Sequence, residues 1–86
     1  MNGRYTVQLS GQAKKDVEKL TPKLRSKLQE ILLRVLAVDP RQGKRLSGDL
    51  KGYWSYRLTY KDRILYRIFD NQHLVFVDRA RTHYGD

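Results

Sequence analysis

The 86-residue sequence contains no cysteine and only two histidines, and these shortages exclude several kinds of chemistry. Without cysteine there is neither a disulfide framework nor a catalytic thiol. His73 and His83 stand far apart and belong to no cluster with metal-ligand spacing. We therefore expect no metal site and no cofactor.

Long apolar runs are also missing. No segment approaches the roughly 20 apolar residues that a membrane-spanning helix needs, and the amino terminus lacks the apolar core of a signal peptide. We therefore expect a cytoplasmic protein with no membrane partner. Because the chain is short and 40% hydrophobic, we also expect residues 1–86 to form one domain around one core.

Acidic residues are scarce relative to basic ones. Nine Asp and Glu stand against eighteen Lys and Arg, which leaves a formal net charge of +9 spread over both halves of the chain. Such an excess attracts polyanions at long range and speeds encounter with them. The charge indicates nucleic acid as a partner, although an acidic protein would satisfy the same field.

The first half of the chain has the pattern of one strand followed by two helices. Alternating apolar residues predict a strand over 5–9. Ser10 then supplies the N-cap of a first helix, and Thr21 with Pro22 begins a second helix. The second helix has a broad apolar face and ends at Asp39–Pro40.

The second half has the pattern of three consecutive strands joined by short turns, over 53–60, 63–69 and 74–77. With the first strand these give the order β-α-α-β-β-β. We therefore predict an α+β fold, with a mainly antiparallel four-stranded sheet and the helical hairpin packed on one face. The other face of the sheet is left free for a ligand.

The segment 41–52, between the second helix and these strands, is rich in glycine and cations and reads as a loop. It is either a solvated connection or a loop that lets backbone amides and cations approach phosphate. On the second interpretation Lys44, Arg45 and Lys51 are candidate RNA contacts. Tyr53, at the end of this loop, stacks a base only if its face of the sheet stays open.

Arginines and a histidine near the predicted strand ends supply the residue types that RNA cleavage requires. Cleavage without a metal needs a base for the 2′-hydroxyl proton, cations for the extra charge on phosphorus, and an acid for the leaving oxygen. A meander can bring Arg57, Arg63, Arg81 and His83 together on the helix-free face. The competing interpretation of a lone arginine is a cross-strand charge pair or a solvated sheet face, and we apply it to Arg67 and Arg79.

Three motifs in the second half carry a resemblance to a known family. Residues 50–59 read LKGYWSYRLT, residues 62–66 read DRILY, and His83-Tyr84 stands near the end. They resemble the YoeB/Txe branch of the RelE/ParE toxin superfamily, with its L-x-G-x-W-S-x-R-[IL]-T segment, its H-R-L-V-Y-type strand and its terminal H-Y. The predicted strand and helical hairpin upstream also fit, so that the resemblance covers nearly the whole chain.

The resemblance implies a type II toxin that acts as a metal-independent endoribonuclease. Such toxins cleave messenger RNA, typically at the ribosome, leave a cyclic phosphate or 3′-phosphate end, and are silenced by a co-expressed acidic antitoxin, YefM-like or similar. By matching position, Arg63 and Arg57 are implied to stabilise the scissile phosphate. His83 is implied to transfer a proton and Tyr84 to orient the phosphate or the adjacent base, with Arg81 as a further phosphate contact.

Two departures from the family pattern affect the implied chemistry. Where YoeB-like proteins commonly have Glu-Pro-Leu, this chain has Lys44-Arg45-Leu46, so the carboxylate proposed as general base is missing. Either Lys44 takes that role, somewhat as RelE-like members use lysine, or His83 acts as base and another group as acid, or catalysis is weak. The chain also continues past Tyr84 with Gly85-Asp86, which adds negative charge near the site.

The missing glutamate keeps a second function open. The chain would then be a binding module, either a ParE-like toxin that inhibits DNA gyrase without cutting RNA or a catalytically weak protein that binds its antitoxin. Loss of the glutamate favours this alternative, whereas His83-Tyr84 favours the ribonuclease.

Overall fold

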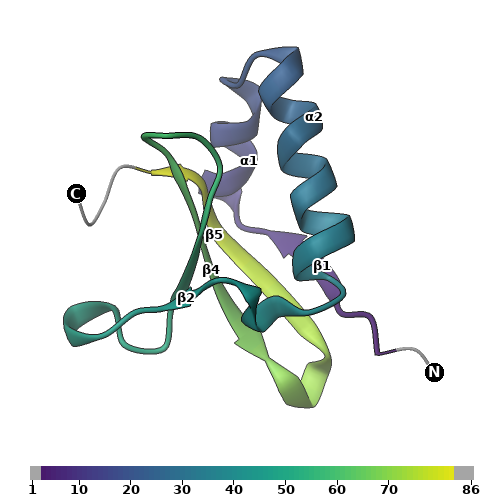
Figure 1. The fold of residues 1–86 in the computed structure, drawn as a ribbon, viewed down its shortest axis with the longest axis vertical. Coiled ribbons are helices and arrows are strands. Elements are labelled where there is room, and N and C mark those ends of the chain that lie inside the picture. The colour runs from purple at the N-terminus through teal and green to yellow at the C-terminus, as the bar shows by residue number, and fades with distance from the viewer. Residues whose placement is uncertain (1–2, 83–86) are drawn as a thin grey trace.

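A five-stranded sheet organises residues 3–82, which are the part of the chain that the computed structural model describes (Figure 1). Its strand order is β1-β5-β4-β3-β2. β1 pairs with β5 in parallel, and the remaining neighbours are antiparallel. In chain order the strands are β1 (Thr6–Leu9), β2 (Lys44–Arg45), β3 (Trp54–Arg57), β4 (Arg63–Phe69) and β5 (Leu74–Thr82).

The predicted α+β class with a helical hairpin on one face is confirmed, but the four-stranded sheet was wrong. Lys44 and Arg45, expected in a loop, form a fifth strand that is too short to show any periodicity. The strand predicted over 53–60 ends at Arg57, because the backbone N–H groups of Leu58 and Thr59 both donate to the carbonyl of Asp62, at 2.9 and 3.2 Å. The chain therefore turns before Tyr60, which is 87% exposed.

The two helices begin at their predicted caps. The hydroxyls of Ser10 and Thr21 accept N–H groups from the first turns of α1 (Gly11–Glu18) and α2 (Pro22–Glu30), at 3.0 and 3.2 Å. α2 continues into a π-helical segment, η1 (Ile31–Leu36), which completes the apolar stretch predicted as one helix. No helix within residues 3–82 is long and apolar enough to cross a membrane.

The core lies between the two helices and one face of the sheet. Ile64 and Tyr66 of β4 are fully buried against Leu28 and Leu36 from the helical side. Because successive strand residues point to opposite faces, the other face of β4 carries its odd-numbered side chains. Neither helix covers this second face, which we call the open face. Its β4 residues are Arg63, Leu65, Arg67 and Phe69.

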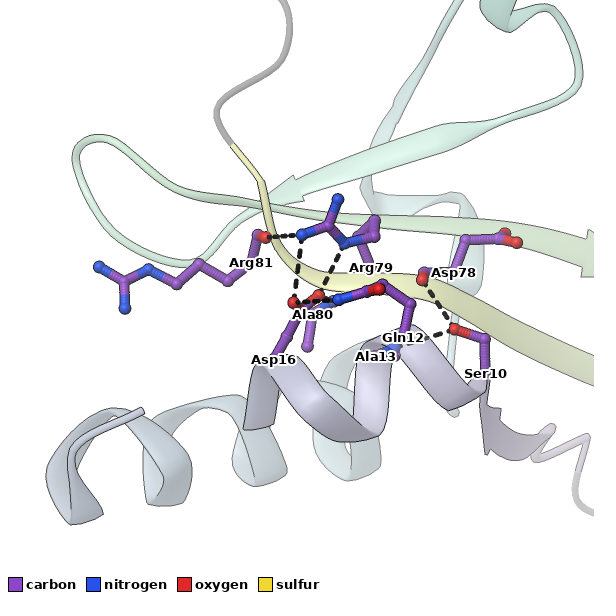
Figure 2. Close-up of polar contacts among 8 residues, drawn as sticks. All are labelled: Ser10, Gln12, Ala13, Asp16, Asp78, Arg79, Ala80 and Arg81. Carbon is purple, nitrogen blue, oxygen red and sulfur yellow. Dashed lines mark hydrogen bonds and ion pairs between the residues drawn. The ribbon is translucent and has the colours of Figure 1, made fainter. Parts of the chain in front are cut away.

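A carboxylate on α1 fixes that helix to β5 (Figure 2). The side chain of Asp16, only 7% exposed, accepts hydrogen bonds from Nε and Nη2 of Arg79, at 2.8 and 3.1 Å, and from the N–H of Ala80, at 3.1 Å. Burial alone would raise the pKa of Asp16, but these bonds and one from Gln12 outweigh burial and hold the pKa below its ordinary value of 3.8. Asp16 therefore stays ionised and ties two distant segments together.

Asp16→Ala should lower the free energy of unfolding by about 2 kcal/mol, because it leaves the Arg79 guanidinium and a buried N–H without their acceptor. Urea unfolding measures the change. Glu30→Ala is the control, since Glu30 and Arg34 form an ion pair at 3.5 Å with side chains 67% and 78% exposed. That variant should change stability by less than about 0.5 kcal/mol. Equal effects of the two substitutions would contradict the role given to Asp16.

Acid should weaken the fold through the same carboxylate. Because the folded-state pKa of Asp16 is depressed, its stabilisation is fully present above the unfolded pKa of about 4 and is lost as the pH falls toward the folded value. Unfolding free energies measured from about pH 5 to pH 2 should fall less steeply in Asp16→Asn than in the wild type. A wild-type slope in Asp16→Asn would reject this assignment.

Candidate phosphate-binding groove

A groove of about 650 Å³ opens at the edge of the sheet, beside the end of β3. β2 pairs only with Trp54 and Ser55, so beyond Ser55 the outer edge of β3 has no neighbouring strand in the described part of the chain. α2, the approach to β2, and the adjoining parts of β3 and β4 all contribute to the walls. The lining residues are Lys27, Gln42, Gly43, Lys44, Ser55, Tyr56, Arg57 and Arg63.

Strand register brings three of the predicted catalytic residues to this groove. Arg57 lies directly opposite Arg63 in the β3–β4 pair, and Lys44 lies directly opposite Ser55 in the β2–β3 pair. Residues paired in this way point to the same face of the sheet, and like charges directly opposite each other destabilise it. An anion between the guanidinium groups would relieve that repulsion, so the register indicates an anion-binding site.

The Arg63 guanidinium also has an unmet donor. Its Nη1 atom is buried, and no described residue accepts a hydrogen bond from it. Buried polar groups are normally paired, and a buried donor without an acceptor costs about 1–3 kcal/mol. The Arg63 side chain also lines the groove, where a phosphate could bind the guanidinium group in the geometry that it favours.

A close backbone contact sets the position of Lys44. The buried Tyr66 hydroxyl donates to the carbonyl of Pro40 at 2.6 Å, and burial raises the pKa of Tyr66 so that it remains a donor. Gly43 passes directly over this hydroxyl. A Cβ atom on Gly43 would overlap the Tyr66 hydroxyl and lie 2.5 Å from the carbonyl oxygen of Ser55. Only glycine therefore lets the chain enter β2 with Lys44 opposite Ser55.

The predicted RNA-binding residues lie outside the groove. Arg45 places its guanidinium carbon 5.4 Å from the centre of the Trp54 ring, and the ring of Tyr53 packs against another arginine on the open face. Lys51 is exposed in the turn before β3. Arg81, whose side chain points away from Asp16 in Figure 2, pairs with Asp62 at 3.3 Å. Whether these residues contact RNA remains a prediction.

The predicted His83 and Tyr84 lie outside the described residues, so their convergence with Arg63 remains a prediction. Arg67 and Arg79 were interpreted as members of cross-strand charge pairs or as part of a solvated sheet face. Arg67 forms the cross-strand pair, because it binds Asp78 of β5 through two bonds, at 2.9 and 2.7 Å. Arg79 is also paired, but its partner is Asp16 on α1 and not a residue of a neighbouring strand.

Sequence reasoning missed several lining residues, namely Lys27, Gln42, Gly43 and Ser55. Lys27 carries no local signal, because its place in the groove depends on how α2 packs against the sheet. Gly43 had a usable signal, since a glycine directly before a cation in a basic loop is typical of a close backbone approach.

Comparison with known proteins identifies the family. Residues 7–83 match the family described as the ParE toxin of the type II toxin-antitoxin system, parDE. Toxin RelG of Mycobacterium tuberculosis is 37% identical over 84 residues, which cover 95% of this chain and 93% of RelG. Toxin YoeB of Streptomyces coelicolor is 44% identical over 57 residues, which cover 62% of this chain and 66% of YoeB.

A solved structure agrees with these matches. The fold superimposes on a chain of the toxin-antitoxin complex RelBE2 of Mycobacterium tuberculosis with a TM-score of 0.84, at 33% identity, covering 96% of this chain and 94% of that one. The chain therefore belongs to the ParE toxin family of type II toxin-antitoxin systems. The predicted resemblance to the RelE/ParE superfamily and its YoeB branch is confirmed.

Gly43→Ala should destabilise the chain by about 1–3 kcal/mol, because the added methyl group must displace either the Tyr66 hydroxyl or β2. Chemical denaturation measures the loss. Gly11→Ala is the matched control, because nothing lies within 4 Å of a Cβ atom added there. It should leave stability unchanged or slightly higher. If both variants are as stable as the wild type, the close approach at Gly43 does not set the position of β2.

Proposed function

We propose that this toxin cleaves messenger RNA at the ribosome as an endoribonuclease and leaves a cyclic phosphate or 3′-phosphate end. The observation that carries the proposal is the Arg57–Arg63 pair, which lies directly opposed on adjacent strands and lines the groove. The anions that RNA presents are its phosphodiester groups, and the net charge of +9 favours binding of this chain to them.

The arginine pair supplies electrostatic stabilisation. The 2′-oxygen attacks phosphorus, the bond from phosphorus to the 5′-oxygen breaks, and a 2′,3′-cyclic phosphate forms. The pentacoordinate phosphorus between these steps carries an additional negative charge, which Arg57 and Arg63 bind from adjacent strands. Strand pairing places the backbones of both residues opposite each other before RNA arrives. A donor aimed at the developing charge contributes about 10²–10³ in rate.

Proton transfer needs two further groups. Lys44, in the groove with both arginines, either accepts the 2′-hydroxyl proton or binds the RNA backbone. His83 transfers the other proton, and Tyr84 orients the phosphate or an adjacent base. Support for placing His83 near the phosphate is that Thr82, the residue before it, pairs with Arg63 across β5 and β4.

The partner proposed for the free toxin is an acidic antitoxin, YefM-like or similar. A toxin similar in fold and sequence is described as part of a toxin-antitoxin complex. The basic surface of this chain favours an acidic segment that folds over the groove and covers its arginines. Carboxylates of the antitoxin would then occupy the positions in the groove where phosphates of the RNA would bind.

A second candidate function is inhibition of DNA gyrase. Two observations favour this function. The family that matches the chain is named for the ParE toxin, and the chain has Lys44 where YoeB-like toxins commonly have glutamate. Induced expression followed by primer extension separates the two functions. Codon-periodic cuts in translated messages indicate a ribonuclease, whereas DNA damage with intact messages indicates a gyrase inhibitor.

Arg63→Ala and His83→Ala should each reduce messenger RNA cleavage by at least about a hundredfold, because each removes a group that acts on the reacting phosphate. Cleavage of a translated message, followed by primer extension, measures the effect. Arg34→Ala is the control, because it removes the same charge from an exposed ion pair on η1.

Thermal unfolding of all three variants shows whether the losses reflect chemistry or folding. The proposed site is rejected if Arg63→Ala and His83→Ala cleave as fast as Arg34→Ala.

A further inference from the structure

Beyond the groove, the open face carries a cluster of aromatic rings around one arginine. The guanidinium carbon of Arg67 lies 5.2 Å from the ring centre of Tyr53, 5.6 Å from that of Phe69 and 5.3 Å from that of Phe76. The rings come from the start of β3 and from β4 and β5. We call these four residues the stacking patch.

The arginine of the patch is fixed and its charge is already compensated. Asp78 accepts two hydrogen bonds from the Arg67 guanidinium, at 2.9 and 2.7 Å. A paired guanidinium attracts phosphate far less than the partnerless donor of Arg63 does. What the patch offers a ligand is flat surface, since Phe69 is 37% exposed and the other rings are half-buried.

The patch is continuous with the groove. Arg63 and Arg67 are both on the open face of β4, about 13 Å apart at the usual rise of a strand. Along β3 the same face runs from Arg57 through Ser55 to Tyr53, because Arg57 pairs with Arg63 and Trp54 pairs with Tyr66. Neither helix crosses this path. A single strand of RNA with a phosphate at Arg63 can therefore continue along the sheet onto the rings.

We propose that the stacking patch binds a base of the RNA whose phosphate occupies the groove, an inference that rests on the function proposed above. Aromatic side chains on adjacent strands of an open sheet face are a recurring way to stack unpaired bases. Stacking of this kind tolerates any base, because every base has a flat face. The patch thus positions the message without selecting its sequence.

The experiment pairs a change in the protein with a change in the RNA. Primer extension first locates the wild-type cleavage site on a short message bound to ribosomes. Messages with one abasic nucleotide at successive positions near that site are then cleaved by the wild type and by Tyr53→Leu and Phe76→Leu. Leucine keeps apolar packing but removes the ring. The matched control is Tyr60→Leu, an exposed tyrosine outside the patch.

The wild type should lose about tenfold in kcat/KM when the abasic position is the one that reaches the patch. Tyr53→Leu and Phe76→Leu should lose about as much on the intact message and lose nothing further on that abasic message. Tyr60→Leu should behave as the wild type. Arg63→Ala should lose cleavage on every message, which separates phosphate binding from base stacking.

Several results would overturn the stacking proposal. Equal wild-type cleavage of all the abasic messages excludes a stacked base, and this measurement does not depend on how any variant folds. Wild-type cleavage by Tyr53→Leu and Phe76→Leu, with weakened binding of an antitoxin, would assign the patch to a protein partner instead. If the wild type cleaves no message at all, the proposed function fails and the stacking proposal fails with it.

Discussion

The register of β3 on β4 is the constraint on which the site depends. It places Arg57 opposite Arg63 and, on the same strands, packs the partly buried Tyr56 and the buried Ile64 toward the helices. A slip of β3 by one residue would turn Tyr56 toward the open face and Arg57 toward the core, so the hydrophobic core itself specifies the face on which Arg57 lies. The same core packing that stabilises the fold therefore also positions the residues of the site.

Three arginines of the sheet show a contrast between structural pairing and an unmet donor. Arg67 and Arg79 each make paired hydrogen bonds to a carboxylate and hold strands or a helix in place. Arg63 instead faces another cation and keeps a buried donor without an acceptor in the described chain. Local rules of charge pairing and hydrogen bonding are thus kept at Arg67 and Arg79 and broken at Arg63, and such exceptions are expected at functional sites.

Sequence patterns predicted the parts of the structure that local periodicity controls. The helix caps at Ser10 and Thr21 and the order of the helices and the four longer strands follow from residue spacing. Spacing permitted Arg57 and Arg63 to meet but did not require it, and the register places them opposite each other. The two-residue β2 could not be predicted, because its pairing depends on the passage of Gly43 over Tyr66. The position of Lys27 beside the groove could not be predicted either, because it depends only on how α2 packs against the sheet.

The arginines of the groove would let one surface bind either an RNA or an antitoxin. A phosphate oxygen and a carboxylate oxygen can each accept hydrogen bonds from the Arg63 guanidinium group, and either anion would offset its repulsion with Arg57. On the proposed function, an acidic segment in the groove would silence the toxin by occupying the atoms that stabilise the reacting phosphate. Because the antitoxin and the message would bind the same two arginines, binding of one would exclude binding of the other.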